Sequence, residues 1–176
     1  MNTAYIVSFI GDDKPGLVEA LSKAIAEHEG NWLHSRLSQL AGKFAGLIEI
    51  SLPIDKANAL ESALKALDAS GLSVRVTACE DLHTPNEFPV LHLTVIGPDR
   101  PGIVREITTE LSRHNINIVS MDTELSIAPM SSEHLFEAVI EIETPAGISA
   151  SQLYDELDEI GERMTLDIAL TEKVAD

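Results

Sequence analysis

The sequence contains a single cysteine, Cys79, among its 176 residues. One cysteine cannot form an internal disulfide bond and cannot build a cysteine-based metal site. The six histidines are not spaced as metal ligands, either with one another or with Cys79. We therefore expect no metal ion and no other cofactor.

Basic residues are also scarce, with 12 Lys and Arg against 29 Asp and Glu and a formal net charge of −17. Nucleic-acid binding needs cationic side chains to displace counterions from phosphates, so this charge argues against a DNA or RNA partner. It equally disfavours an anionic membrane surface. The acidity is concentrated in residues 83–176, with 18 acidic and 5 basic residues, and there it is either a solvated surface or a docking face for a basic protein.

Long hydrophobic runs and catalytic motifs are absent as well. The first apolar run ends at Gly11, too early for a signal peptide or a membrane span, so we expect a cytoplasmic protein. The sequence has no GxSxG, HExxH or CxxC pattern and no paired nucleophile and base. We therefore expect that the protein is not an enzyme.

What the sequence does have is an internal repeat. Gly11-Asp-Asp-Lys-Pro-Gly-Leu-Val18 returns 86 positions later as Gly97-Pro-Asp-Arg-Pro-Gly-Ile-Val104. A histidine and an asparagine follow each copy at matching positions, and the second copy carries about six extra residues around 128–134. A repeat of this length is a duplicated small domain, not a solenoid unit.

Each copy has the pattern strand, helix, strand, strand, helix, strand. In the first copy the strands are expected at 4–10, 32–40, 44–52 and 72–79, with helices opening at Pro15 and near Asp55. This order predicts an α+β fold of two tandem ferredoxin-like βαββαβ domains. We assign residues 1–81 to the first domain, 82–89 to a linker and 90–176 to the second domain.

A ferredoxin-like domain covers only one sheet face with its helices. The strand patterns put Leu47 and Val139 on the side opposite their buried neighbours. An uncovered apolar face needs a neighbour, so the two copies, or two chains, should pack together. We accordingly expect a homo-oligomer.

The repeated loop between the first strand and first helix is where binding chemistry is expected. Proline suits the start of a helix, and glycine lets a ligand or another backbone come close. The free amides of the first turn attract a carboxylate, and Asp13 or Asp99 could hold the ammonium group of an amino acid. Alternatively, the two aspartates simply satisfy the helix N-terminus. A nucleotide loop is excluded because Leu17-Val18 and Ile103-Val104 replace the required Lys-Ser/Thr.

Two asparagines, Asn31 and Asn117, lead into the second strand of each copy. We expect them beside the repeated loop, either as ordinary turn residues or as amide contacts to a ligand.

The Asp13-Lys-Pro-Gly-Leu-Val and Asp99-Arg-Pro-Gly-Ile-Val motifs, each followed by a helix, an asparagine and a hairpin, resemble the ACT domain, a small ligand-responsive regulatory module. The tandem arrangement and the segment Asn31-Trp-Leu-His-Ser-Arg-Leu-Ser-Gln-Leu40 resemble the glycine cleavage system transcriptional repressor family. In the second copy Met121-Asp-Thr-Glu124 stands where the first has Ser35-Arg-Leu-Ser38.

The resemblance implies a non-enzymatic repressor that contacts a transcriptional activator, not DNA, and responds to glycine or serine. The implied ligand-binding residues are Asp13, Gly16, Leu17, Asn31, Asp99, Gly102, Ile103 and Asn117. The alternative is a regulatory subunit that binds an amino acid and controls a metabolic enzyme.

Overall fold

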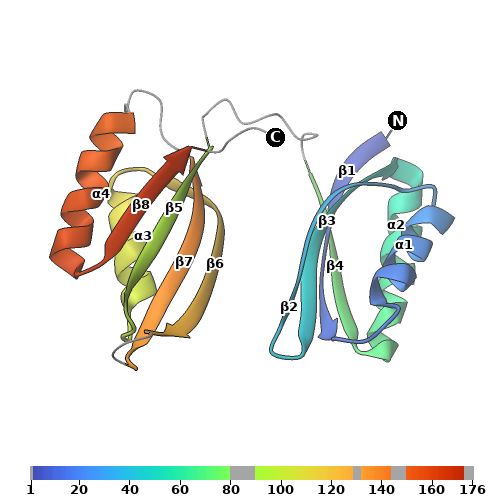
Figure 1. Cartoon of the computed structure of the whole chain (residues 1–176). Coiled ribbons are helices and arrows are strands. Elements are labelled where there is room, and N and C mark those ends of the chain that lie inside the picture. The colour runs from blue at the N-terminus through green and yellow to red at the C-terminus, as the bar shows by residue number, and fades with distance from the viewer. Residues whose placement is uncertain (1, 80–89, 129–131, 144–149, 173–176) are drawn as a thin grey trace. The chain divides into compact units, whose positions relative to one another are not determined.

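A computed structural model describes residues 2–79, 90–128, 132–143 and 150–172. The chain divides into two compact units, Met1–Thr84 and Pro85–Asp176, and each is described by itself (Figure 1). The predicted linker, 82–89, lies outside the described residues.

The first unit has a central strand, β1, bordered by β3 and β4, with β2 beyond β3. The order β2-β3-β1-β4 is antiparallel throughout. Two short 3-10 turns flank α2, at Ile54–Lys56 and Leu67–Ser70. The elements are β1 (Asn2–Asp12), α1 (Leu17–Glu27), β2 (Asn31–Leu40), β3 (Lys43–Pro53), α2 (Ala57–Ala66) and β4 (Leu72–Ala78).

The second unit repeats this plan. Its sheet has the order β6-β7-β5-β8, again antiparallel, with β5 in the position of β1. The predicted βαββαβ fold is therefore confirmed for both copies. The elements are β5 (Val90–Pro98), α3 (Ile103–Arg113), β6 (Asn117–Ile127), β7 (His134–Glu143), α4 (Ala150–Met164) and β8 (Asp167–Glu172).

Both helices of a unit lie on the same face of its sheet (Figure 1). Side chains alternate along each strand, so every second residue meets the helices and forms the core. In β3, Ile48 and Ile50 are fully buried whereas Leu47 is 53% exposed. The core of the first unit comprises Tyr5, Val7, Phe9, Leu21, Ile25, Ile48, Ile50, Leu52, Leu60, Leu64 and Leu72.

The second core has the same construction, with Ala138 and Ile140 buried and Val139 48% exposed. We call the sheet side that faces away from the helices of its own unit the open face. Leu47 and Val139 thus lie on the open faces, as their strand patterns predict. Packing of these faces against a neighbour stays a prediction.

The six extra residues of the second copy extend the hairpin. Ala41 and Gly42 alone separate the paired Leu40 and Lys43 of the first unit. In the second unit β6 and β7 gain the pair Ile127–His134, and residues 128–133 connect them. Residues 129–131 of this connection lie outside the described part.

A register irregularity occurs at the same place in both sheets. The pairing of β2 with β3 shifts between Trp32 and His34, and that of β6 with β7 shifts between Ile118 and Ser120. One extra residue in a strand moves every later side chain to the opposite face. As a result, Arg36 lies opposite Leu47, and Asp122 opposite Val139, on the open faces.

Candidate functional site

The two repeated loops are tied to the hairpin of their own unit by equivalent backbone hydrogen bonds. The amide of Asp13 donates to the carbonyl of Gly42, and that of Asp99 to the carbonyl of His134, each at 3.0 Å. Both aspartates are exposed. Within the described residues, neither carboxylate takes part in a hydrogen bond or ion pair, so they do not act as helix caps.

The second glycine of each motif is required by its backbone conformation. Gly16 and Gly102 are the N-cap residues of α1 and α3, with φ of 92° and 90°. This left-handed conformation is strained for residues that carry a Cβ. A Cβ at Gly16 would meet no atom within 4 Å, so the space above the helix start is open.

The helices consequently begin two residues later than expected. The proline-led opening at Pro15 is wrong in detail, because Gly16 leaves the helical region and α1 starts at Leu17. In the second copy the matching proline is Pro101, and α3 likewise starts two residues after it, at Ile103. Ile103 is 3% exposed and packs in the core, and Leu17 packs against its own core. A ligand at Leu17 would therefore meet its backbone amide, whereas the amide of Ile103 already donates to the carbonyl of Arg100 at 3.3 Å.

The first glycine of each motif serves packing instead. A Cβ on Gly11 would lie 2.9 Å from Cδ1 of Leu72, and one on Gly97 would lie 2.3 Å from Cδ2 of Leu166. Glycine at these positions lets the central strand approach the chain that enters β4 or β8. The two glycines of each motif are therefore required for different reasons, packing at the first and backbone conformation at the second. Of the second glycines, Gly16 borders open space, whereas a Cβ on Gly102 would lie 3.9 Å from Glu106 Oε1.

The two asparagines are not beside the loop of their own unit. Asn31 pairs with Ser51, which pairs with Ala4, near the beginning of β1. The loop follows the end of β1 at Asp12, eight residues away, which is roughly 26 Å along a strand. Asn117 is displaced in the same way, and its Nδ2 donates to Glu143 Oε2 at 2.8 Å.

This arrangement corrects the expected grouping. The loop residues Asp13, Gly16 and Leu17 lie together, and so do Asp99, Gly102 and Ile103. Neither set includes an asparagine from its own unit.

A charged pair that the sequence did not single out stands at the loop of the first unit. Lys43 donates a hydrogen bond to Asp12, directly across the β1–β3 pairing. This hydrogen bond and the Lys43 charge, with a smaller contribution from Lys14, hold the pKa of the Asp12 carboxyl below its ordinary value. In the second unit Pro98 and Leu135 occupy these positions, so the two loops differ in charge.

The open faces carry hollows of different chemistry. In the first unit Ile6, Ser35, Leu47 and the pair His34–Glu49 border a hollow of about 350 Å³, with Nδ1 of His34 3.0 Å from Oε2 of Glu49. In the second unit a hollow of about 260 Å³ is strongly acidic, and its lining includes Asp122, Glu124, Glu137, Thr94 and Val139.

The described ranges of the chain contain no cluster of three or more His, Cys, Asp or Glu side chains arranged to hold a metal ion. No helix within them is long and apolar enough to cross a membrane.

Both units of the chain are similar in sequence to a known protein domain. The ACT domain matches residues 3–77 and, again, residues 92–162. A UPF0237 protein from Methanopyrus kandleri is 36% identical over 77 residues, which are 43% of this chain and 79% of that protein. A UPF0237 protein from Pyrobaculum aerophilum is 34% identical over 79 residues, covering 44% of this chain and 81% of the relative.

Two solved structures resemble the chain over its whole length. An unknown protein from Galdieria sulphuraria has 29% identity and a TM-score of 0.81, covering 99% of this chain and 100% of that one. A protein proposed to be a glycine cleavage system transcriptional repressor has 17% identity and a TM-score of 0.76, with 97% of each chain covered. At that identity the second likeness establishes the fold alone. With matched folds, repeated loops and two domain matches, the chain belongs to the family of ACT-domain regulatory proteins, with two ACT domains in tandem.

Proposed function

We propose that the protein is a non-enzymatic, amino-acid-responsive regulator that represses glycine cleavage genes by contacting a transcriptional activator. The observation that carries this proposal is the pair of exposed aspartates, Asp13 and Asp99, each near the start of a helix. Neither carboxylate is engaged within the described residues, so both are available to a ligand.

The two ends of a small zwitterion suit this geometry. Amides at the start of α1 have no partner within the helix, and with the helix dipole they favour a carboxylate. The carboxylate of Asp13 can accept hydrogen bonds from the ligand's ammonium group. Asp99 occupies the same place beside α3, but there the amide of Ile103 already donates to the carbonyl of Arg100, so α1 offers the more open site. Glycine or serine is the expected ligand, as the resemblance to the glycine cleavage system transcriptional repressor family implies.

The partner contact is assigned to the acidic open face of the second domain. Asp122, Glu124 and Glu137 gather there around Val139, which is 48% exposed. An exposed apolar residue ringed by acidic side chains suits a partner with a basic rim and an apolar centre. The net charge of −17 is unsuited to DNA, so the regulatory output is a protein contact.

Ligand binding is tested by thermal unfolding of the full chain with each of the twenty amino acids at millimolar concentration. A ligand that binds only the folded state raises the melting temperature. Glycine or serine should produce the largest rise, and the absence of any shift across the panel would reject the sensing role.

Substitutions then locate the site. Asp13→Ala and Asp99→Ala should each weaken amino-acid binding, with a loss of about 1.5–3 kcal/mol for a charge-assisted hydrogen bond. Asp55→Ala and Asp155→Ala remove exposed carboxylates elsewhere in the two domains and serve as matched controls. If both loop variants bind as tightly as their controls, the ligand does not use these aspartates.

A second function is a regulatory subunit that binds an amino acid and controls a metabolic enzyme. The hollow of the first domain favours this alternative, because its lining combines Ile6 and the 53% exposed Leu47 with charges of both signs, Arg36 and Glu49, whereas the hollow of the second domain is acidic. Affinity capture from native extract separates the two. A captured activator with a DNA-binding domain supports the repressor, whereas a captured enzyme supports the subunit.

A further inference from the structure

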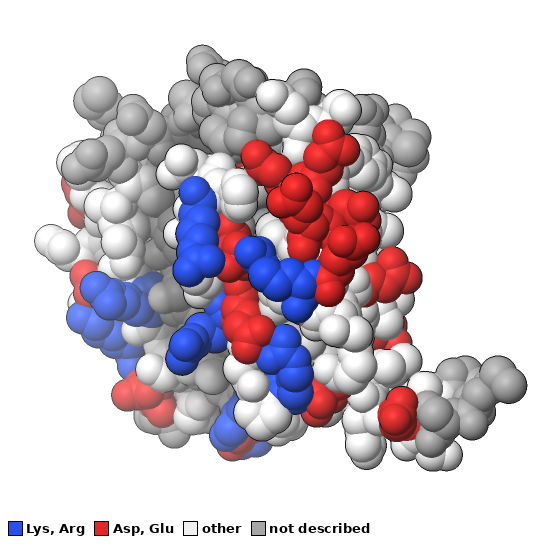
Figure 2. Space-filling model, turned by 90° about the vertical axis from the view of Figure 1, so that its left-hand side faces the viewer, with Lys and Arg blue, Asp and Glu red and all other residues white. Residues whose placement is uncertain are grey.

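One cleft of the second domain holds most of that half's basic residues. Residues 83–176 include only five Lys and Arg. Four of them, Arg100, Arg105, Arg113 and Arg163, line a cleft of about 340 Å³ beside α3 and the end of α4. Figure 2 shows basic side chains gathered on this face beside a larger acidic group. The acidity of the second domain is thus interrupted at a single concave place.

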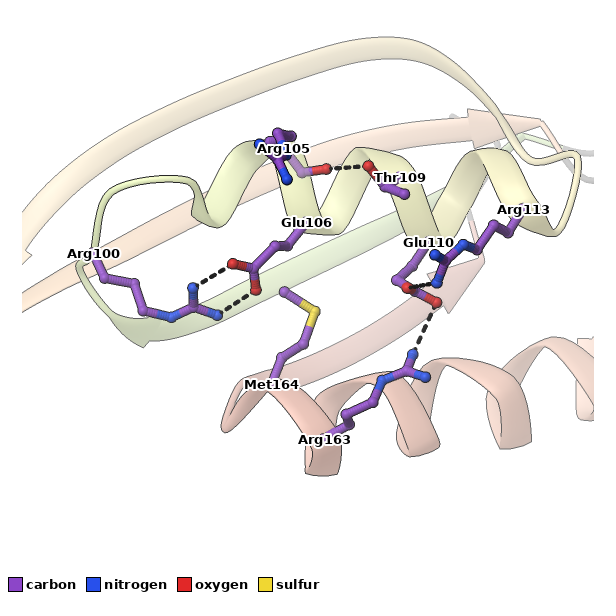
Figure 3. Close-up of a pocket in the computed structure, with 8 residues that line it drawn as sticks. All are labelled: Arg100, Arg105, Glu106, Thr109, Glu110, Arg113, Arg163 and Met164. Carbon is purple, nitrogen blue, oxygen red and sulfur yellow. Dashed lines mark hydrogen bonds and ion pairs between the residues drawn. The ribbon is translucent and has the colours of Figure 1, made fainter.

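Two carboxylates hold three of these arginines in position (Figure 3). Arg100 donates to both oxygens of Glu106, at 2.8 and 2.7 Å. Glu110, whose side chain is 13% exposed, accepts from Arg113 on its own helix and from Arg163 on α4, the latter at 2.8 Å. These ion pairs fix the cleft walls and join the two helices.

The fourth guanidinium, that of Arg105, is not neutralised in this way. Among the described residues it makes no hydrogen bond or ion pair, and only the backbone carbonyl of Arg105 is used, by Thr108 and Thr109. Four arginines against two glutamates leave an excess of two positive charges in the cleft. Bracing two helices would not require this excess.

The ACT fold itself does not require the cluster either. At the spacing of 86 residues, Arg105 and Arg113 correspond to Glu19 and Glu27 of α1. Glu106 and Glu110 correspond to Ala20 and Ala24, by the same spacing. The first domain therefore folds with none of these four charged side chains, and the cluster is a feature of the second domain.

We propose that this cleft binds a small phosphate-bearing molecule. Guanidinium groups present planar pairs of N–H donors that match phosphate oxygens, and they remain charged at any physiological pH. The cleft volume falls at the lower end of the usual range for small-ligand pockets, about 300–1,000 Å³. The guanidinium group of Arg105 supplies N–H donors that no carboxylate occupies, and Thr109 and Met164 also line the cleft. The cleft shares no lining residue with the proposed amino-acid site, but it adjoins the loop of Asp99, because Arg100 follows that residue and Glu106 Oε1 would lie 3.9 Å from a Cβ on Gly102.

Titration of the full chain with inorganic phosphate and with AMP, at constant ionic strength, tests the proposal by calorimetry. Saturable binding at one site per chain is expected. Arg105→Gln should weaken it by about tenfold or more, the loss of one charge-assisted hydrogen bond. Arg75→Gln removes an arginine of the first domain and should leave the affinity unchanged. Arg105→Lys, which keeps the charge without the fork, should fall between the wild type and Arg105→Gln.

The two ligands distinguish the source of the phosphate. Tighter binding of AMP means that an ester group also occupies the cleft, and equal affinities mean that the phosphate group alone is recognised; both support the proposal. It is overturned if neither ligand saturates at millimolar concentration, if Arg105→Gln binds like the wild type, or if citrate binds and phosphate does not. Circular dichroism verifies that the variants are folded. Because Arg105→Gln retains both loop aspartates, its response to glycine reports on the proposed function separately.

Discussion

The first helices of the two domains, α1 and α3, agree at buried positions and disagree at exposed ones. Leu21 and Ile25 correspond to Ile107 and Leu111, and all four are at most 2% exposed. On the outer surface, by contrast, glutamates of α1 are replaced by arginines of α3. Core packing restricts a duplicated helix far more than solvent does. The two domains therefore differ mainly in their surfaces.

The open faces differ in the same way. Arg36 in β2 corresponds to Asp122 in β6, and both lie opposite an exposed apolar residue of the neighbouring strand. Further acidic residues of the second face replace neutral ones, with Glu124 for Ser38 and Glu137 for Ala45. Substitutions at positions that the two domains share should thus change the stability of both domains equally. Substitutions at positions where they differ should have unequal effects.

The largest effect is expected from the shared cores. Leu21→Ala and Ile107→Ala each remove a buried side chain, and each should lower the free energy of unfolding of its domain by about 2–5 kcal/mol. Urea unfolding measures the loss, and amide hydrogen exchange assigns it to a domain. Because the cores are separate clusters, increased exchange throughout the other domain would contradict this picture.

A smaller but equal loss is expected at the helix starts. Gly16→Ala and Gly102→Ala place a residue with a Cβ in nearly the same left-handed backbone conformation. Each should lower the free energy of unfolding by about 1–2 kcal/mol. Asparagine tolerates this conformation better, so Gly16→Asn and Gly102→Asn are the controls. Thermal unfolding compares the pairs; an alanine variant as stable as the wild type would show that φ is not the reason for glycine.

An unequal effect is expected where the helices diverge. Glu110→Gln weakens the hold on Arg113 and Arg163 and should destabilise the second domain by about 1 kcal/mol, since both arginines are largely exposed. Glu27→Gln changes an exposed carboxylate of α1, 3.9 Å from Lys23, and should stay within about 0.5 kcal/mol. If urea unfolding gave the same loss of free energy of unfolding for Glu110→Gln and Glu27→Gln, the ion pairs of Glu110 would not stabilise the second domain more than the Lys23–Glu27 pair stabilises the first.

The smallest expected effect is on titration. The hydrogen bond from Arg100 lowers the pKa of the Glu106 carboxyl. Its stabilising contribution is therefore present above the unfolded pKa of about 4.3 and is lost as the pH falls through the lower folded value. Arg100→Gln should raise the Glu106 pKa, measured by carboxyl carbon NMR, whereas Lys65→Gln should not. An unchanged pKa in Arg100→Gln would assign the lowering to another group.

The repeat and its hydrophobic periodicity were sufficient to predict the fold, because both units obey the same alternation of buried and exposed residues. The position of Asn31 was not predicted, although the chain order contained the reason. Helix α1 carries the chain back along the length of the sheet. Strand β2 therefore begins at the same end of the sheet as β1, far from Asp13, which follows the other end of β1. Asn31 follows the loop by one helix in the sequence, but that helix carries it to the opposite end of the sheet.

The arginine cleft could not be found from the sequence for a different reason. Arg163 and Glu110 are 53 residues apart, and no periodic pattern links them. Only the packing of α4 beside α3 brings their side chains together. The sequence shows that this half has only five basic residues, but it does not show that four of them line one cleft.

The register shift shared by β2 and β6 indicates an order of events in the history of the chain. Losing the extra residue from one strand would turn its later side chains over, exposing the core face and burying Arg36 or Asp122. Neither copy could discard it alone without refolding a whole sheet. The shared irregularity is therefore best explained by an ancestral single domain that already carried it when its gene doubled, whereas the arginines and the acidic face distinguish the two copies.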